Sequence, residues 1–552
     1  MYIAKQKING RDYFYIRKAV RKGSKVRSEN VAYGGKTLEE AKVKLERLNS
    51  GDKPFKDIVS SVQNLEKKDL SIEEMAAFCK RKGFIYQSGE IYGGFSGFWD
   101  FGFLGVELKN NIKGEWWNFN VRSRSDVVGI DGSIITHPKV WEASGHVESF
   151  SDIFVVCKKC KKANKIDKNE LGRVRCECGG EYDAEKSKEF KLMFETLVGE
   201  NIKSYLRPET AQLIFTNFKF VQENARLKLP FGIAQIGKAF RNEIAPRDFL
   251  FRSREFEQME IEYFVDPKEK CPYAIGDTEI LVLSDKDQEE NNEPKLMSFK
   301  DALRKGIIKT DWHAYWLEYE FLWFVNLGAD KNKFRIRQHV KDEKAHYALD
   351  TWDLEYKFPF GWKELQGTAN RADFDLKQHE KFSKSDLKIQ NDKGEKILPH
   401  VVCEPSQGVE RAMLVFLFDA YTYDSKMENV VLRLHPKLSP VKAAVFPIVK
   451  SEEYEKISDE IVKELKKEFN VSCDKSGSIG KRYARNDEIG TPMCITIDEK
   501  TSRDKTVTIR DRDTTEQVRV KINDLRDVVR KVVQGDNLLR FGKAVKTRKK
   551  GL

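Results

Sequence analysis

The sequence predicts a multidomain chain of the α+β and α/β classes. It comprises a domain on an antiparallel sheet, a C-terminal α/β domain, and a small basic N-terminal module of β-sheet plus helix. Three observations predict this. Two charged strands flank a turn at 237–264, strands alternate with helices from 437 onward, and short alternating runs fill the first 35 residues. With 552 residues, the chain is long enough for about three domains that each bury a core.

The composition predicts a soluble cytoplasmic protein without a membrane partner. Charged residues make up 34% of the sequence and the mean hydropathy is −0.59. No run of 18 apolar residues occurs, and the N-terminus is too charged for a secretory signal. Nine dispersed cysteines, an odd number, favour reduced thiols. The net charge of +12 indicates a polyanionic partner such as nucleic acid, although a basic protein can simply be soluble that way.

The stretch 237–264 is expected to bring charged and aromatic side chains to one space. Each half has the pattern of a strand, and the segment 245–248 is expected to form the loop of an antiparallel hairpin. Residues two apart on a strand share a face. These are Arg241 and Glu243 on the first strand, and Phe256, Gln258 and Glu260 on the second. The set suits a bound nucleotide; the alternative is a surface hairpin with cross-strand ion pairs.

The first 50 residues hold 13 Lys/Arg against 5 Asp/Glu. Three alternating runs separated by turn signals predict a three-stranded sheet, followed by an amphipathic helix from about Leu38 to Leu48. Aromatic and basic residues are interleaved along the second run: Tyr13, Phe14, Tyr15, Arg17, Lys18, Arg21 and Lys22. The pattern favours an RNA-binding module over residues 1–55, and the alternative is a solvated basic module without a ligand.

Four of the cysteines form a cluster with metal-ligand spacing. Cys157 and Cys160 form a CxxC pair, and Cys176 and Cys178 follow as a CxC pair. Four thiolates can close a tetrahedral Zn²⁺ site that leaves no position for water, so a bound ion would be structural. The shortened second pair leaves open free thiols or a degenerate ribbon.

Composition shifts set the remaining boundaries. We expect the antiparallel-sheet domain over 60–436, the α/β domain over 437–545 and a basic tail over 546–552. The first of these carries two insertions, a cysteine-rich one at 150–200 and a polar surface one at 265–310. The aromatic-rich segment 311–328 predicts a buried helix, and 401–416 predicts a strand, a glycine turn and a helix.

Polar residues mark two of these elements. Arg207 and Glu209 flank Pro208, which keeps the chain extended before a helix that Thr210 is expected to cap. In the later segment Glu404 ends the strand, Ser406 and Gly408 allow close approach of a ligand, and Arg411 lies in the first helical turn. An arginine there is usually an ordinary helix residue, and the alternative is contact with phosphate.

Taken together, these motifs resemble those of the class II aminoacyl-tRNA synthetases, and among them the dimeric glycyl-tRNA synthetases. The resemblance covers roughly residues 70 to 540, while residues 1–55 match none of the family's motifs. The similar stretches are THPKVWEASGHVESFSD (dimer-forming motif 1), FRNEIAPRDFLFRSREFEQMEIEYF (motif 2), EPSQGVERAML (motif 3), LRPETAQ, GWKELQG, DFDLKQH and, for the anticodon-binding domain, YARNDEIGTP. The resemblance implies a homodimer with an antiparallel catalytic sheet and a C-terminal anticodon-binding domain.

The resemblance also implies an activity and roles. Glycine and ATP would give glycyl-adenylate and pyrophosphate, and a tRNA(Gly) hydroxyl would then take the glycyl group. The catalytic and ATP-binding roles it implies are Arg241 on the α-phosphate, Phe256 on adenine, Glu243 on the adenine amine, Arg411 on the γ-phosphate, and Glu364 and Glu404 on Mg²⁺.

For glycine, the family positions imply Glu209 and Glu260 as ammonium acceptors and Ser406 near the Cα. The alternative for Glu209 is a simple pair with Arg207. In the anticodon-binding domain, Arg482, Arg485 and Arg510 are the candidates for tRNA contacts. Two other classes stay open: a noncatalytic synthetase-like accessory protein, and a synthetase for another small amino acid.

Overall fold

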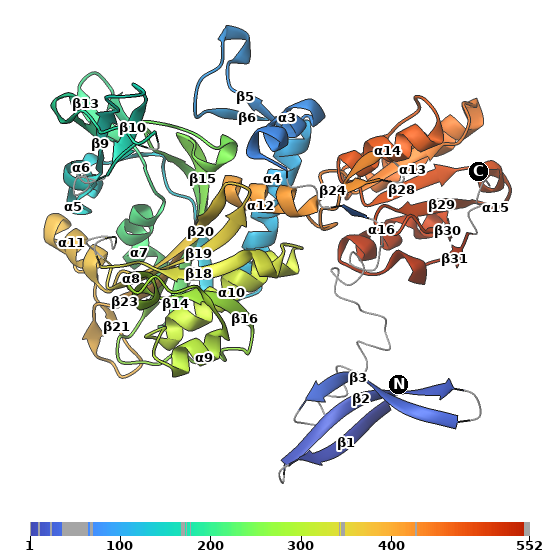
Figure 1. The fold of residues 1–552 in the computed structure, drawn as a ribbon, viewed down its shortest axis with the longest axis horizontal. Helices are drawn as coiled ribbons and strands as arrows, with labels where there is room; N and C mark the ends of the chain where they lie inside the picture. Colours follow the sequence, from blue (N-terminus) through green and yellow to red (C-terminus); the bar gives the residue numbers. More distant parts are fainter. Residues whose placement is uncertain are drawn as a thin grey trace. The chain divides into compact units, whose positions relative to one another are not determined.

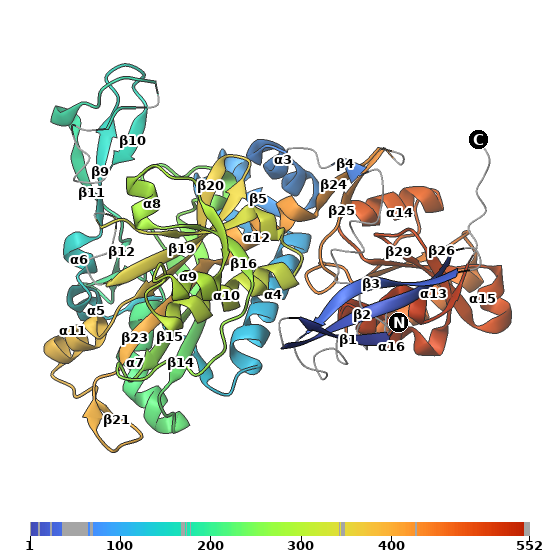
Figure 2. The same ribbon diagram turned by 60° about the horizontal axis from the view of Figure 1, so that its bottom comes forward.

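A computed structural model describes the chain over 2–8, 11–22, 25–35, 65–66, 70–166, 172, 174–176, 178–341, 343, 348–425 and 428–545. For 2–8, 11–22, 25–35 and 65–66 the structure describes the backbone alone. The chain divides into two compact units, shown in Figures 1 and 2. One comprises Lys67–Tyr423 with Val430–Pro440, and the other Met1–Glu66, Asp424–Asn429 and Val441–Leu552.

The larger unit is built on one nine-stranded sheet. Its order is β17-β16-β18-β19-β20-β23-β15-β14-β7. The strands are β7 Val127–Ile130, β14 Phe231–Phe240, β15 Glu255–Val265, β16 Glu279–Leu283, β17 Lys295–Ser298, β18 Phe334–Gln338, β19 Asp350–Phe358, β20 Gly361–Asn370 and β23 His400–Gly408. Every neighbouring pair is antiparallel except β16–β18 and β14–β7. The predicted antiparallel sheet is confirmed.

Helices cover this sheet. The helix α10 (Asp311–Asn326) contacts β20 and β23, α7 (Ala211–Ala225) contacts β14 and β15, and α12 (Val409–Ala420) lies against β15, β23 and α4 (Phe103–Trp117). Apolar residues occur around the whole circumference of α10, as a helix buried on all sides requires, and its burial confirms the predicted helix. The predicted strand, turn and helix at 401–416 are confirmed as β23 and α12.

The shorter elements of this unit surround the sheet. They are α3 Ile72–Lys82, β5 Ile85–Gln87, β6 Trp99–Phe101, β8 Ile135–Thr136, α5 Pro138–Ala143, α6 His146–Ser149, β12 Glu195–Val198, β13 Ile202–Leu206, α8 Asp285–Glu289, α9 Phe299–Arg304, α11 Phe374–Ser383, β21 Ile389–Gln390 and β22 Lys396–Ile397. A further sheet of β9 (Ser151–Val156), β10 (Ala163–Ile166) and β11 (Lys188–Lys191) projects from the unit in both views (Figures 1 and 2). It lies within the predicted cysteine-rich insertion.

The predicted hairpin differs from the observed one in its first strand. That strand, β14, begins earlier and ends at Phe240, so Arg241 and Glu243 lie in the connection to β15 rather than on a strand face. The chain turns there because the Glu243 N–H donates to the Arg241 carbonyl at 2.7 Å. The segment 245–248 is only part of this longer connection. On β15 the predicted alternation is confirmed.

The segment 265–310 is more than a surface insertion. It contributes β16 and β17 to the edge of the main sheet, and Ile280 and Phe299 are fully buried. Its polar loops conceal this in the sequence, because the two strands are short and only one face of each needs apolar residues.

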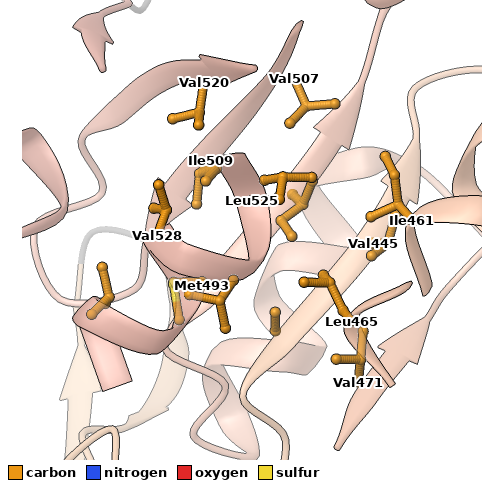
Figure 3. Close-up of a cluster of buried hydrophobic side chains, with 14 of the residues drawn as sticks. Val445, Ile461, Leu465, Val471, Met493, Val507, Ile509, Val520, Leu525 and Val528 are labelled. Atoms are coloured by element: carbon orange, nitrogen blue, oxygen red, sulfur yellow. The ribbon is translucent and has the colours of Figure 1, made fainter. Parts of the chain in front are cut away.

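The C-terminal part of the smaller unit is an α/β domain with strand order β27-β26-β28-β29-β30-β31. Its elements are β26 Ala443–Pro447, α13 Glu452–Leu465, β27 Val471–Cys473, α14 Ile479–Glu488, β28 Met493–Ile497, α15 Glu499–Asp504, β29 Thr506–Asp511, β30 Gln517–Lys521, α16 Leu525–Val533 and β31 Lys543–Ala544. Figure 3 shows its core, in which Ile461 and Leu465 of α13 and Leu525 and Val528 of α16 meet strand residues such as Ile509. The predicted alternation of strands and helices is confirmed.

At the N-terminus, β1 (Tyr2–Ile8), β2 (Arg11–Lys22) and β3 (Lys25–Gly35) form an antiparallel sheet in the order β1-β2-β3. The predicted three-stranded sheet is therefore confirmed. The predicted helix at 38–48 and the tail at 546–552 lie outside the described residues. Three short strands, β25 (Asn429–Leu432), β24 (Tyr421–Asp424) and β4 (Leu65–Glu66), form a sheet in the order β25-β24-β4. Within the described ranges, no helix is both long and apolar enough to span a bilayer.

Candidate active site

A cleft of about 310 Å³ opens on the main sheet, over β15, β20 and β23. It is lined by every residue of the larger unit for which the sequence predicted a role in ATP or glycine binding. These are Glu209, Arg241, Glu243, Phe256, Glu260, Glu364, Glu404, Ser406 and Arg411. The fold thus brings together side chains from four separate stretches of sequence. Their individual roles stay predictions.

At one end of the cleft a guanidinium lies between aromatic rings. The centre of the Arg241 guanidinium is 5.4 Å from the Phe256 ring centre and 5.7 Å from that of Phe150. Its Nε donates to the Pro208 carbonyl at 3.1 Å, which fixes its direction while leaving the other N–H groups for a ligand. The Glu243 carbonyl accepts from Arg254, and one Glu243 carboxylate oxygen is buried without a hydrogen-bond partner among the described residues. This end can hold phosphate, a base and an amine donor.

A second arginine lies where α12 begins. Arg411 stacks on Phe251 at 4.5 Å, and its Nε donates to the Phe251 carbonyl at 3.3 Å. Its Nη1 donates to the Glu364 carbonyl at 3.0 Å and approaches the Glu364 carboxylate at 3.2 Å. Glu364 is half-exposed on the cleft, so both charges of this pair are accessible to a bound ligand.

The opposite end of the cleft is acidic. Glu209 accepts from the Gln212 amide at 3.1 Å and pairs with His146 Nε2 at 3.3 Å. Burial by itself would raise the pKa of Glu209, but His146, Arg371 and Gln212 outweigh it and hold that pKa well below its usual range. Burial and the Glu209 charge instead raise the pKa of Glu260. The alternative pair with Arg207 is absent from the described contacts of Glu209.

Several contacts orient the other groups at this end. Arg207 donates to the carbonyls of Lys238 and Gly132, at 2.6 and 2.7 Å. The Thr210 hydroxyl donates to Glu260, so it does not cap α7 as the sequence predicted. Ser406 Oγ accepts from the Gln258 amide at 3.2 Å.

A buried network connects the acidic residues. Arg371 makes two hydrogen bonds to Asp375, at 2.7 and 2.8 Å, and two to Glu404, at 2.8 and 3.0 Å. The Gln212 amide donates to both Glu209 and Asp375. The positions of Glu209 and Glu404 are therefore linked through Gln212, Asp375 and Arg371. Sequence reasoning assigned no role to His146, Gln212 or Arg371, although each lies in or beside a quoted motif.

A third acid lies beside Glu260 and Glu404. Carboxylate oxygens of Glu260, Glu262 and Glu404 lie within 4.8 Å of one another. Glu262 is fully buried and neither of its oxygens has a hydrogen-bond partner among the described residues. Burial and the neighbouring Glu404 raise the pKa of Glu262 well above its usual value.

The two predicted Mg²⁺ ligands differ in their fit. Mg²⁺ prefers carboxylate oxygens that are shared with substrate phosphates. Glu364, at the open end beside Arg411, meets this requirement. Glu404 is buried and both of its oxygens already accept from Arg371. Glu364 approaches Arg411 through one carboxylate oxygen and is half-exposed. The geometry therefore favours Glu364.

The four clustered cysteines meet beyond the C-terminal end of β9, two of them in the connection from β9 to β10. Their sulfur atoms all lie within 4.8 Å of one another, and the pairs Cys157–Cys178 and Cys160–Cys176 are 3.5 and 3.6 Å apart. Tetrahedral Zn–S bonds of about 2.3 Å would place the sulfurs about 3.8 Å apart. A Cβ at Gly180 would lie 2.7 Å from the Cys157 sulfur, so this position requires glycine. The site fits a structural Zn²⁺.

The three arginines predicted to contact tRNA differ in exposure. Arg510 is buried and makes two hydrogen bonds to Asp487, at 2.8 and 3.0 Å. Arg482 is also buried, and donates to the Pro447 carbonyl at 2.6 Å. Burial favours structural roles for both. Arg485 is exposed and pairs with Asp474 at the surface. A tRNA phosphate could replace Asp474 as the partner of Arg485.

Comparisons with known proteins agree with the fold. Residues 442–532 match the family model described as an anticodon binding domain. A solved prolyl-tRNA synthetase from Cryptosporidium parvum, complexed with halofuginone and AMPPNP, superposes with a TM-score of 0.51 at 14% identity. The match covers 84% of this chain and 77% of that one. The chain therefore has the fold of the class II aminoacyl-tRNA synthetases.

Curated relatives narrow the class. The glycine–tRNA ligase of Treponema denticola is 42% identical over 478 residues, covering 84% of this chain and 97% of its own. Those of Acetivibrio thermocellus and Thermobifida fusca are 43% and 40% identical and cover 82% and 85% of this chain, with 97% and 99% of their own. The chain belongs to the glycine–tRNA ligase family.

Proposed function

We propose that the protein activates glycine with ATP and transfers the glycyl group to the 3′ end of tRNA(Gly). The observation that carries the proposal is the single cleft that gathers all nine predicted ATP and glycine residues in a chain of this family. In the first step a glycine carboxylate oxygen attacks the α-phosphorus and pyrophosphate leaves. In the second a terminal tRNA hydroxyl attacks the glycyl carbonyl and AMP leaves.

The chain's own residues act by positioning and by neutralising charge. Arg241 holds the α-phosphate, Phe256 stacks on adenine and Glu243 accepts from its amine. Arg411 binds the γ-phosphate. Glu364 would hold Mg²⁺, which supplies positive charge to the phosphate oxygens.

Glycine has no side chain to recognise, so its selection rests on the ammonium and on exclusion of larger side chains. Glu209 and Glu260 accept from the ammonium, and Ser406 lies near the Cα. These groups are held in place by Thr210, Gln258 and the Arg371 network behind Glu404. The pocket around the glycine Cα is therefore rigid and does not widen for the methyl group of alanine.

The test is amino-acid-dependent ATP–pyrophosphate exchange by the purified chain with glycine, alanine, serine, proline and threonine. We expect exchange with glycine alone. Exchange with another small amino acid would favour a different synthetase, and exchange with none would favour an accessory protein. A noncatalytic accessory protein is disfavoured because it would be expected to lack the two phosphate-binding arginines, whereas Arg241 and Arg411 both line the cleft.

We further propose a cytoplasmic homodimer with a catalytic domain over 60–436 and tRNA contacts from the anticodon-binding domain over 437–545. Exposed apolar side chains lie between β5 and α4, at Ile91, Tyr92 and Phe95, and on the first residue of α4, Phe103. They support a contact with a second copy. Analytical ultracentrifugation tests the dimer, and a monomer at micromolar concentration would contradict it.

We propose that Cys157, Cys160, Cys176 and Cys178 hold a structural Zn²⁺. Metal analysis of the purified protein should give about one zinc per chain. Replacing Cys157 and Cys160 by serine should remove it, whereas Cys473→Ser, at an exposed isolated thiol, should not. Zinc retained in the double variant would refute the assignment.

A further inference from the structure

The N-terminal sheet has two faces of different chemistry. In the antiparallel register, Tyr15 of the central strand pairs with Ala4 and Tyr33, and Arg17 pairs with Tyr2 and Asn30. Pairing and strand alternation place one set of residues on the same face, here called the tyrosine face. It comprises Tyr2, Ala4, Gln6 and Ile8 of β1, Arg11, Tyr13, Tyr15, Arg17, Ala19 and Arg21 of β2, and Val26, Ser28, Asn30 and Tyr33 of β3.

The tyrosine face combines stacking groups with positive charge. Four tyrosines and three arginines lie on it, and along β2 the order is Arg11, Tyr13, Tyr15, Arg17. The two acidic residues of the three strands, Asp12 and Glu29, occupy the opposite face together with the apolar Ile3 and Ile16. That face also carries six lysine and arginine residues but only one aromatic residue, Phe14, so it offers charge without a row of stacking groups. The tyrosine face is therefore the one that combines several stacking groups with positive charge and carries no acidic residue.

We propose that the tyrosine face binds single-stranded loop or terminal nucleotides of the tRNA substrate. Aromatic side chains on a sheet stack on unpaired bases, and neighbouring guanidinium groups pair with the phosphates between them. In duplex DNA the base faces are stacked inside the helix, so duplex DNA could contact the arginines of this face but could not stack on its tyrosines. The inference rests on the proposed function, because a synthetase already holds tRNA, and a second surface on the same chain then acts at high effective concentration.

The N-terminal module is not part of the resemblance to the synthetase family. Its residues match none of the synthetase motifs, and the curated relatives cover 97% or more of their own length while leaving part of this chain unmatched. The tyrosine face would therefore add tRNA affinity to a complete synthetase rather than replace one of its parts.

The experiment compares two double variants of the full chain that lose the same charge. R11Q/R17Q changes the tyrosine face and K5Q/K7Q the opposite face. We expect R11Q/R17Q to raise the tRNA KM about tenfold and to lower the slope of log affinity against log salt by about 1.5, since each lost phosphate contact removes about 0.7 to 0.9. K5Q/K7Q should change both much less. Equal effects from the two variants would overturn the assignment of the face.

A second pair of variants tests stacking. Y13L/Y15L should weaken tRNA binding about tenfold, and Y13F/Y15F, which keeps the rings, should restore it. Parent-like tRNA binding by Y13L/Y15L, or tighter binding of a duplex DNA competitor than of tRNA, would overturn the proposal. Glycine-dependent ATP–pyrophosphate exchange needs no tRNA and should stay unchanged in every variant. Absence of exchange in the parent would instead refute the proposed function.

Discussion

Glu209 is the residue on which we expect glycine activation to depend most. It is buried, charged and held by Gln212 and His146 at the acidic end of the cleft. Glu209→Gln removes the charge that would meet the ammonium, and losing one partner of a buried charge pair costs about 2 to 5 kcal/mol. We expect kcat/KM for glycine in pyrophosphate exchange to fall about 30-fold or more. Glu223→Gln, at an exposed site of the helix α7 that follows Glu209, is the control. Full exchange by Glu209→Gln would refute the role.

His146 is a positioning residue for Glu209. Its Nδ1 lies 2.7 Å from the Ser144 hydroxyl and its Nε2 3.3 Å from Glu209, so the ring is held from both sides. His146→Ala should raise the glycine KM about tenfold and leave the ATP KM nearly unchanged, because a hydrogen bond to a charged group contributes about 1.5 to 3 kcal/mol. His146→Gln can still donate and should recover part of the loss. Glu148→Ala, exposed on α6, serves as the reference, and equal changes in both KM values would argue for a general structural defect.

The residues of the site were predictable where their type and spacing carry chemistry. Arg241, Phe256 and Arg411 lie in charged or glycine-rich stretches that suit phosphate and base binding. The pairing of Arg371 with Glu404 was not predictable, because residues 33 positions apart meet only once β20 and β23 are paired. His146 lies outside the sheet altogether, and only the fold shows that it reaches Glu209.

At the scale of elements, the packing of α10 on β23 buries an acid. Glu320 is fully buried, accepts from the Gln407 amide at 3.2 Å, and burial raises its pKa to about 8. The native state therefore keeps this proton up to about pH 8, whereas the unfolded chain loses it near pH 4.5. Since the native state binds more protons over this window, the free energy of unfolding falls as pH rises through it.

Glu320→Gln removes this pH dependence. The variant should match the parent near pH 5 and exceed it in free energy of unfolding at pH 8 by a few kcal/mol. Chemical denaturation at both pH values measures the difference. Glu289→Gln, exposed on α8, should change neither value. An equal effect of Glu320→Gln at both pH values would mean that Glu320 does not retain its proton in the native state.

The elements that periodicity defines were predictable, and their ends were not. The α/β alternation of the C-terminal domain and the aromatic helix α10 follow from patterns that burial requires. The end of β14 does not, because residues 237–244 continue to alternate after the chain has turned at Arg241. Thr210 has the right type for a cap, but Glu260 takes its hydroxyl once β15 lies beside α7. Tertiary contacts thus determine both where β14 ends and why the Thr210 side chain does not cap α7.

At the scale of the whole molecule, activation and tRNA recognition are assigned to different units. The unit Lys67–Tyr423 with Val430–Pro440 contains the main sheet, its helices and every residue that lines the cleft. Residues 442–532, which match the anticodon binding domain, belong to the other unit and have a core of their own. This order of domains was predictable from the change of pattern near residue 437. The boundaries themselves stay predictions.

Deleting 441–552 should therefore separate the two half-reactions. We expect glycine-dependent pyrophosphate exchange to persist, because the cleft and its supporting network lie in the other unit. Charging of tRNA should fall more than about a hundredfold, because the contacts that position and select the tRNA are removed. Removing only the tail 546–552 should leave both steps intact. Circular dichroism of the truncated chain checks that it is folded. Equal loss of exchange and charging in a folded truncated chain would mean that the C-terminal domain also supports adenylate formation.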